Sequence, residues 1–202
     1  MITAREALLR LQEGNARFAA DEPERGLQHH RVPRERLVAG QDPFAIVVGC
    51  SDSRVPVEIV FDQGPGELFV IRVAGNVISC TQMASIEFAA ENFGARLVVV
   101  LGHTGCGAIN AALAAVQTGV EPKPENLRLL IEKIRPAVER AVELGGGRDS
   151  AEIAQLAGRE YVRHAVESIC SGSDTIRRLI ENDGFLVVGA EYSLATGLVE
   201  FF

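Results

Sequence analysis

Two short fragments rich in metal-binding side chains each follow an apolar run, and this arrangement limits the folds that the chain can adopt. Residues 50–54 read CSDSR and follow the run Phe44–Gly49, while residues 103–107 read HTGCG and follow the run Leu97–Leu101. Short apolar runs of this kind are typical of strands that are buried in a parallel sheet. In such a sheet, ligands bind outside the carboxyl ends of the strands. We therefore expect the two fragments to meet at that edge.

The remaining patterns predict an α/β fold in a single domain spanning residues 1–202. We expect a mostly parallel central sheet flanked by helices, with a helical insertion before the last strands. Residues 1–40 should form an N-terminal helix and arm: Thr3 and Glu6 have the spacing of a capping box, and the polar segment 21–36 is expected to be an arm or loop. Strands are expected at 44–49, 68–73, 97–101, 185–192 and 198–202, and helices also at 81–92 and 107–117.

The segment from Pro124 to about Asn182 carries helical periodicity only. Pro136 lies inside this pattern and is expected to kink or divide a helix, because proline has no amide donor. Ser150 and Ser173 are candidate N-terminal caps for the two helices that follow. These features predict a helical insertion ahead of the closing pair of strands.

The composition argues against some classes of function. A net charge of −7 disfavours a nucleic-acid partner, which requires a clustered basic surface. We expect no membrane partner, because no apolar run reaches spanning length and the N-terminus lacks the apolar core of a signal peptide. Four cysteines without a secretion signal indicate reduced thiols and a cytoplasmic protein. Of these, Cys80 and Cys170 have no metal-spaced neighbours and are expected to be small buried residues.

Cys50, His103 and Cys106 are candidate zinc ligands. Thiolates and imidazole bind zinc well, and three such ligands leave one position of a tetrahedron open. His103 and Cys106 are three residues apart at a predicted strand-to-helix turn, so both can hold one ion. Asp52 is an ambiguous fourth ligand. The alternative is that these are buried structural cysteines and a core histidine.

Taken together, the two fragments resemble those of the β-class carbonic anhydrases, which hydrate carbon dioxide reversibly to bicarbonate. The resemblance covers nearly the whole chain and includes the segments 65–70 (PGELFV) and 85–89 (SIEFA). It implies one Zn²⁺ per subunit, held by Cys50, His103 and Cys106. It also implies a reaction in which zinc-bound hydroxide attacks carbon dioxide.

The resemblance gives Asp52 and Arg54 a catalytic role. In the family an aspartate–arginine dyad leaves the fourth zinc position to water and orients the hydroxide. In some members the aspartate binds zinc instead, so Asp52 is a possible fourth ligand in a closed form. That bicarbonate-inhibited subclass has a tryptophan where this chain has Val47, although Arg72 and Tyr192 match the other residues of its bicarbonate site. We expect the open form in the resting enzyme.

Three further residues are expected to handle the substrate. Gln41 matches a family glutamine that hydrogen-bonds substrate or bicarbonate, and Phe69 and Phe88 match aromatic positions that line an apolar pocket. For each aromatic residue the alternative is plain core packing. In the family, the residues that match Gln41 and Phe88 reach the zinc of a neighbouring subunit. The resemblance therefore implies a homo-oligomer, either a dimer or a tetramer.

Other functions fit parts of the same sequence. A hydrolase of carbon disulfide or carbonyl sulfide would share the fold and the zinc ligands, so the motifs do not separate it from a carbonic anhydrase. A non-catalytic zinc-stabilised or redox-sensing module would have a closed site and no use for Gln41 and Arg54. A zinc deaminase is disfavoured, because both of its sequence signatures are missing.

Overall fold

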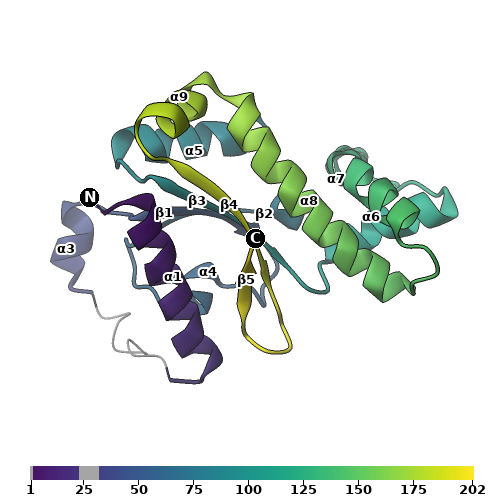
Figure 1. Ribbon diagram of the computed structural model, residues 1–202, viewed down its shortest axis with the longest axis horizontal. Coiled ribbons are helices and arrows are strands. Elements are labelled where there is room, and N and C mark those ends of the chain that lie inside the picture. The colour runs from purple at the N-terminus through teal and green to yellow at the C-terminus, as the bar shows by residue number, and fades with distance from the viewer. Residues whose placement is uncertain (1, 23–31) are drawn as a thin grey trace.

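The protein is built around a five-stranded, mostly parallel sheet (Figure 1). The computed structural model describes residues 2–22 and 32–202. The strands are β1 (Ala45–Cys50), β2 (Leu68–Val73), β3 (Leu97–His103), β4 (Leu186–Tyr192) and β5 (Val199–Phe201). Their order is β2-β1-β3-β4-β5, and only β5 runs antiparallel to its neighbour. The predicted α/β class and mostly parallel sheet are confirmed.

Helices cover both faces of the sheet, because successive side chains of each buried strand point to opposite faces. Val47 and Val99 pack on the face covered by α1 and α4, and Ile46 and Val98 pack on the face covered by α5, α8 and α9. No helix among the described residues is long and apolar enough to cross a membrane. The bounds of these helices are α1 (Ala4–Ala19), α4 (Val57–Val60), α5 (Cys80–Asn92), α8 (Ser150–Gly172) and α9 (Asp174–Asn182).

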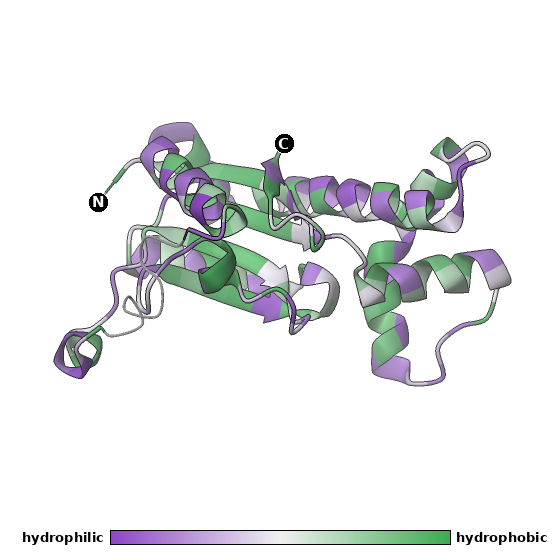
Figure 2. Cartoon of the chain, turned by 90° about the horizontal axis from the view of Figure 1, so that it is seen from below, coloured by the Kyte–Doolittle hydropathy of each residue, from purple (hydrophilic) through white to green (hydrophobic). Residues whose placement is uncertain are grey.

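A third apolar cluster joins the helical insertion to the carboxyl end of the sheet. Two helices, α6 (Gly107–Thr118) and α7 (Glu125–Leu144), pack with α8 in this cluster, which also includes Cys50 and Cys106. Figure 2 shows α6 and α7 beyond the tips of the strand arrows. These two helices therefore form a wall of the region where the parallel strands end.

The N-terminal helix begins as the sequence predicts. The Thr3 hydroxyl accepts a hydrogen bond from the amide of Glu6, and the Glu6 carboxylate accepts one from the amide of Thr3, which completes the capping box. The prediction of an irregular arm at 21–36 is wrong at its end, because α3 covers Arg34–Ala39. Residues 23–31 of that arm lie outside the described residues. None of the α3 residues is buried, so the helix lacks the apolar periodicity that marks a packed helix.

Two details of the insertion can be compared with the prediction. Pro136 does not divide α7, which continues through it with an apolar stripe that packs against neighbouring helices on both sides of the proline. The N-cap of α8 is Asp149 and not Ser150: the Asp149 carboxylate accepts hydrogen bonds from amides of the first turn. Ser173 caps α9 as predicted, with its hydroxyl accepting a hydrogen bond from an amide of that helix.

Candidate metal centre

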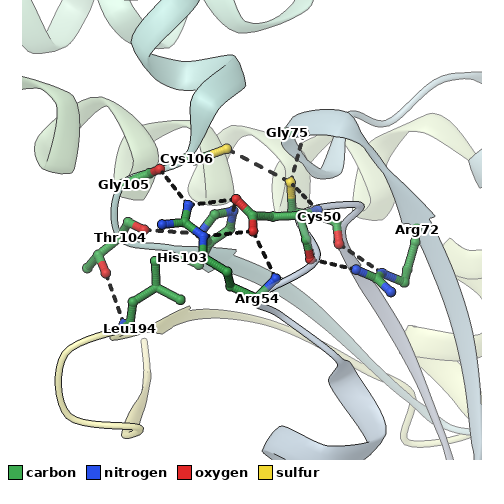
Figure 3. A network of polar contacts seen from close by, with 10 residues as sticks. Cys50, Arg54, Arg72, Gly75, His103, Thr104, Gly105, Cys106 and Leu194 are labelled. Atoms are coloured by element: carbon green, nitrogen blue, oxygen red, sulfur yellow. Dashed lines mark hydrogen bonds and ion pairs between the residues drawn. The ribbon is translucent and has the colours of Figure 1, made fainter.

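The three candidate ligands meet at the carboxyl edge of the sheet (Figure 3). Cys50 ends β1, His103 ends the neighbouring parallel strand β3, and Cys106 is the N-cap of α6. Their ligand atoms all lie within 4.8 Å of one another, and the two sulfur atoms are 4.0 Å apart. Two thiolates on one tetrahedral zinc ion stand about 3.8 Å apart, given Zn–S bonds of about 2.3 Å. The spacing of the sulfur atoms therefore fits a single ion of this size.

The imidazole of His103 is oriented for metal binding. Its side chain is 0% exposed, and Nδ1 lies 3.0 Å from the carbonyl oxygen of Thr104. Because a carbonyl oxygen only accepts, Nδ1 carries the proton and Nε2 keeps its lone pair. Nε2 is one of two buried side-chain nitrogen or oxygen atoms that have no hydrogen-bond partner within residues 2–22 and 32–202. A buried polar atom without a partner is costly, and a metal ion at this position would satisfy it.

The environment of the two thiols favours a negative charge on Cys50. Its Sγ accepts hydrogen bonds from the amides of Asp52 at 3.4 Å and Gly75 at 3.3 Å. The hydrogen bond between the Cys50 and Cys106 thiols contributes most to lowering the pKa of Cys50, which falls to about 3. The same contact, together with burial, raises the pKa of Cys106. Burial and the contact between the two sulfurs therefore oppose ionisation of both thiols at once, and a bound cation would offset that cost.

Asp52 lies next to these ligands but is held by Arg54. The guanidinium donates from Nε and Nη2 to the two carboxylate oxygens at 2.9 and 2.8 Å, and the Arg54 amide donates to Oδ1 at 3.0 Å. Asp52 Oδ2 is 3.9 Å from His103 Nε2. The hydrogen bonds from Arg54 hold the pKa of Asp52 well below its usual range. The carboxylate is therefore charged, and it accepts hydrogen bonds at the edge of the ligand cluster.

Two arginines fix the backbone around the site (Figure 3). Arg54 Nη2 also donates to the carbonyl of Gly105 at 3.3 Å, and this contact links the two sequence fragments. Arg72 donates to the carbonyl oxygens of Cys50 at 2.9 Å and Asp52 at 2.7 Å. The sequence pointed to Arg72 only through the family's bicarbonate site. Arg72 can hold the backbone of Cys50 and Asp52 because the pairing of β2 with β1 places it beside the end of β1.

The residues predicted to handle the substrate lie away from the ligands of their own chain. Gln41 is exposed and precedes β1, whereas Cys50 ends that strand. Phe69 pairs with Ile46, four residues before Cys50, and this is about 13 Å along a strand. Phe88 on α5 is 52% exposed, and its ring centroid lies 6.2 Å from that of Phe69. One chain alone therefore does not bring these side chains to its metal ligands.

The other residues singled out from the sequence lie outside the ligand cluster. The prediction that Cys80 is buried is wrong, because this residue is exposed at the start of α5, and Cys170 is only partly buried. Val47 is fully buried in the core of the sheet. Tyr192 is also buried, and its ring packs against Phe18 with the centroids 6.3 Å apart.

Comparison with known proteins places this geometry in a family. A model of the carbonic anhydrase family matches residues 45–199. Carbonic anhydrase 2 of Mycobacterium tuberculosis strain H37Rv is 40% identical over 189 residues, which cover 93% of this chain and 87% of that protein. The carbonic anhydrase of Mycolicibacterium smegmatis is 37% identical over 193 residues, which cover 94% of this chain and 89% of that protein.

Solved structures of β-carbonic anhydrases have the same fold. CafA of Aspergillus fumigatus matches with a TM-score of 0.76 and 24% identity, over 98% of this chain and 89% of that one. The Coccomyxa enzyme, solved in complex with acetazolamide, matches with a TM-score of 0.71 and 26% identity, over 93% of this chain and 82% of that one. The chain therefore belongs to the carbonic anhydrase family, in its β class, and its reaction is the reversible hydration of carbon dioxide to bicarbonate.

Proposed function

We propose that the chain hydrates carbon dioxide at a zinc ion held by Cys50, His103 and Cys106, with the fourth coordination position open. The observation that carries this proposal is the buried, unpartnered Nε2 of His103 close to two thiol sulfurs. Two sulfur atoms and an imidazole nitrogen are a donor set that suits zinc. When bound, the ion would lower the pKa of water and so supply hydroxide, although two thiolate ligands make this effect weaker than in the three-histidine carbonic anhydrases.

Asp52 would orient the attacking water. Its carboxylate can only accept a hydrogen bond, because Arg54 keeps it charged by holding its pKa well below the usual range. An attacking oxygen whose O–H donates to Asp52 has its lone pair free to face the carbon of carbon dioxide. Attack forms one C–O bond and opens one C=O double bond, so that bicarbonate leaves with the negative charge. The proton passes to solvent.

Arg54 would keep Asp52 away from the fourth position. To bind zinc itself, the carboxylate would have to give up the hydrogen bonds from Nε and Nη2 of Arg54. Charge-assisted, two-point contacts of this kind fix geometry more firmly than neutral ones. The guanidinium is also tied to the carbonyl of Gly105. These contacts support the open form as the resting state.

A second subunit would complete the substrate pocket. Phe69, Phe88 and Phe93 form an aromatic cluster with ring centroids 5.7 to 6.2 Å apart, and Phe88 in this cluster is half exposed. Such an apolar surface suits an uncharged linear substrate. Gln41 is likewise exposed and away from the ligands of its own chain. Two β-carbonic anhydrases of Sordaria macrospora that share the fold are tetrameric. We therefore propose a dimer or tetramer in which Gln41 and the aromatic cluster face a partner's zinc site.

The ligand set also bears on the cellular compartment. Cys50 and Cys106 must stay reduced to bind a metal, and thiols persist in reducing compartments. We therefore propose that the enzyme works in the cytoplasm. Cell fractionation followed by detection of the protein tests this location.

The proposal is tested by measuring zinc content and stopped-flow carbon dioxide hydration on one preparation. We expect one zinc per chain, and hydration that is lost with a chelator and restored by zinc. His103→Ala should lose both bound zinc and hydration activity. Cys80→Ser, which removes an exposed thiol, should keep both. Full activity without bound zinc would contradict the metal site. Hydrolysis of carbon disulfide or carbonyl sulfide without carbon dioxide hydration would contradict the substrate.

A further inference from the structure

The turn that follows β2 packs against the three elements that carry the metal ligands. It comprises Ala74–Asn76 and contacts β1, β3 and α6, whose ends bear Cys50, His103 and Cys106. The amide of Gly75 donates a hydrogen bond to Cys50 Sγ at 3.3 Å (Figure 3). The conformation of this turn therefore acts directly on a ligand sulfur.

The backbone of the turn is left-handed at two consecutive residues. Gly75 has a φ of 65° and Asn76 a φ of 45°. A Cβ on Gly75 would lie 2.9 Å from Ala108 Cβ and 3.0 Å from Ile134 Cδ1, so only glycine fits there. Asparagine tolerates the left-handed region better than most residues, but glycine adopts it without strain. The backbone alone would therefore favour glycine at position 76 as well.

The side chain of Asn76 is buried without a protein partner for its donor. Asn76 is 3% exposed, and its Nδ2 has no hydrogen-bond acceptor in the described part of the chain. The one other buried side-chain atom there without a partner is Nε2 of His103, to which we assign zinc. An unpaired buried donor costs stability. Asn76 is thus present despite both an unfavourable backbone conformation and an unsatisfied amide.

We propose that Asn76 is a positioning residue of the metal centre, an inference that rests on the proposed zinc site. The Asn76 side chain adds a buried amide donor to a turn whose Gly75 N–H already donates to Cys50 Sγ, and its N–H dipoles lie beside the ligand-bearing elements. When a cation takes the place of the thiol protons, the negative charge on the two sulfurs increases. Buried donors stabilise that charge strongly, because the surroundings are poor in water. Groups outside the ligand set commonly tune metal affinity in this way.

The variant Asn76→Gly separates the amide from the backbone. Glycine accepts the left-handed φ, so the metal-free variant should unfold at the same or a higher denaturant concentration than the wild-type chain. Zinc affinity, measured by competition with a chelator, should fall about 10- to 100-fold. The thiolate-to-metal charge-transfer band of the cobalt-substituted protein should shift. Asp21→Gly is the matched control, because it removes another left-handed non-glycine residue outside the metal centre and should change neither metal readout.

The possible outcomes are distinguishable. Wild-type zinc affinity and an unchanged cobalt spectrum in Asn76→Gly would overturn the proposal, because the amide would then have no effect on the metal. Failure of Asn76→Gly to fold in the presence of zinc would also overturn it, since the amide would then serve the fold. If the wild-type protein itself binds no zinc, the proposed zinc site fails, and this inference fails with it.

Discussion

Removing the side chain of Arg54 should release Asp52 onto the metal. Of the hydrogen bonds that the Asp52 carboxylate accepts from Arg54, only the one from the backbone amide, at 3.0 Å, survives in Arg54→Ala. Asp52 Oδ2 already lies 3.9 Å from His103 Nε2. An imidazole nitrogen and a carboxylate oxygen on one tetrahedral zinc ion stand about 3.4 Å apart, given bonds of about 2.0–2.2 Å. A shift of about 0.5 Å therefore brings the carboxylate to ligand spacing.

We expect Arg54→Ala to keep its zinc and to lose about 100-fold in kcat/KM for carbon dioxide, the order of loss that a misplacement of about 1 Å causes. Stopped-flow hydration and metal analysis on the same sample measure the two quantities. The cobalt-substituted variant should no longer respond to azide, because the carboxylate occupies the position that the anion needs. Arg178→Ala is the matched control: it removes an exposed arginine of α9 that pairs with Glu91 at 2.7 Å, and it should behave as wild type.

A double variant examines the cause of this loss. In Arg54→Ala combined with Asp52→Asn, the side chain at position 52 has no charge to draw it onto the ion, so azide binding should return while activity stays low. Wild-type kcat/KM in the single variant would refute the reasoning outright. Low activity with undiminished azide binding in the single variant would show that Arg54 does not control the fourth position.

Three further predictions concern pH, metal removal and assembly. Hydration by the zinc-loaded protein should rise between pH 6 and 9, because the thiolates of Cys50 and Cys106 neutralise the ion and weaken its effect on water. Asp52 does not titrate in that range, since its pKa is held well below the usual value, and a flat profile would contradict the account. Free zinc at about 100 times Kd should stabilise the fold by about 2.7 kcal/mol, so calorimetry should show a Tm about 5–10 °C lower after chelation; equal midpoints would argue against a site formed only in the folded state. Chains carrying Gln41→Ala or His103→Ala should each be poorly active alone but recover activity as mixed oligomers, and exchange of subunits without recovery would exclude a shared site.

The cluster of Cys50, His103 and Cys106 could be predicted from the sequence because its signal is local. Each ligand fragment follows a continuous apolar run, and those runs are β1 and β3, which are parallel neighbours whose carboxyl ends coincide. Four residue pairs join the two strands, the last being Gly49 with Leu101. Cys50 and His103 come one and two residues after that pair, at the same end of the sheet. No further information is needed to bring Cys50 and His103 together.

The supporting contacts could not be predicted, because they depend on packing between distant residues. Arg72 holds the carbonyl of Cys50, 22 residues earlier in the chain, through the pairing of β2 with β1. The left-handed turn at Gly75 and Asn76 contacts β1, β3 and α6, and the sequence alone does not predict those contacts. The short helix α3 was missed for the opposite reason: it buries no residue, so the sequence carries no apolar pattern there.

In the proposed zinc site, the position of Arg54, two residues after Asp52, would decide the charge of the metal centre. Two thiolates neutralise the charge of a zinc ion, and a bound Asp52 would leave the centre with one negative charge in excess. Such a centre would attract less electron density from water and would have no open position. The two hydrogen bonds from Arg54 instead keep the Asp52 carboxylate outside the ligand set. In that position the carboxylate can still accept hydrogen bonds. In the proposed site, the spacing of the Asp-x-Arg fragment would thus determine both which group occupies the fourth position and how strongly the ion acts on water.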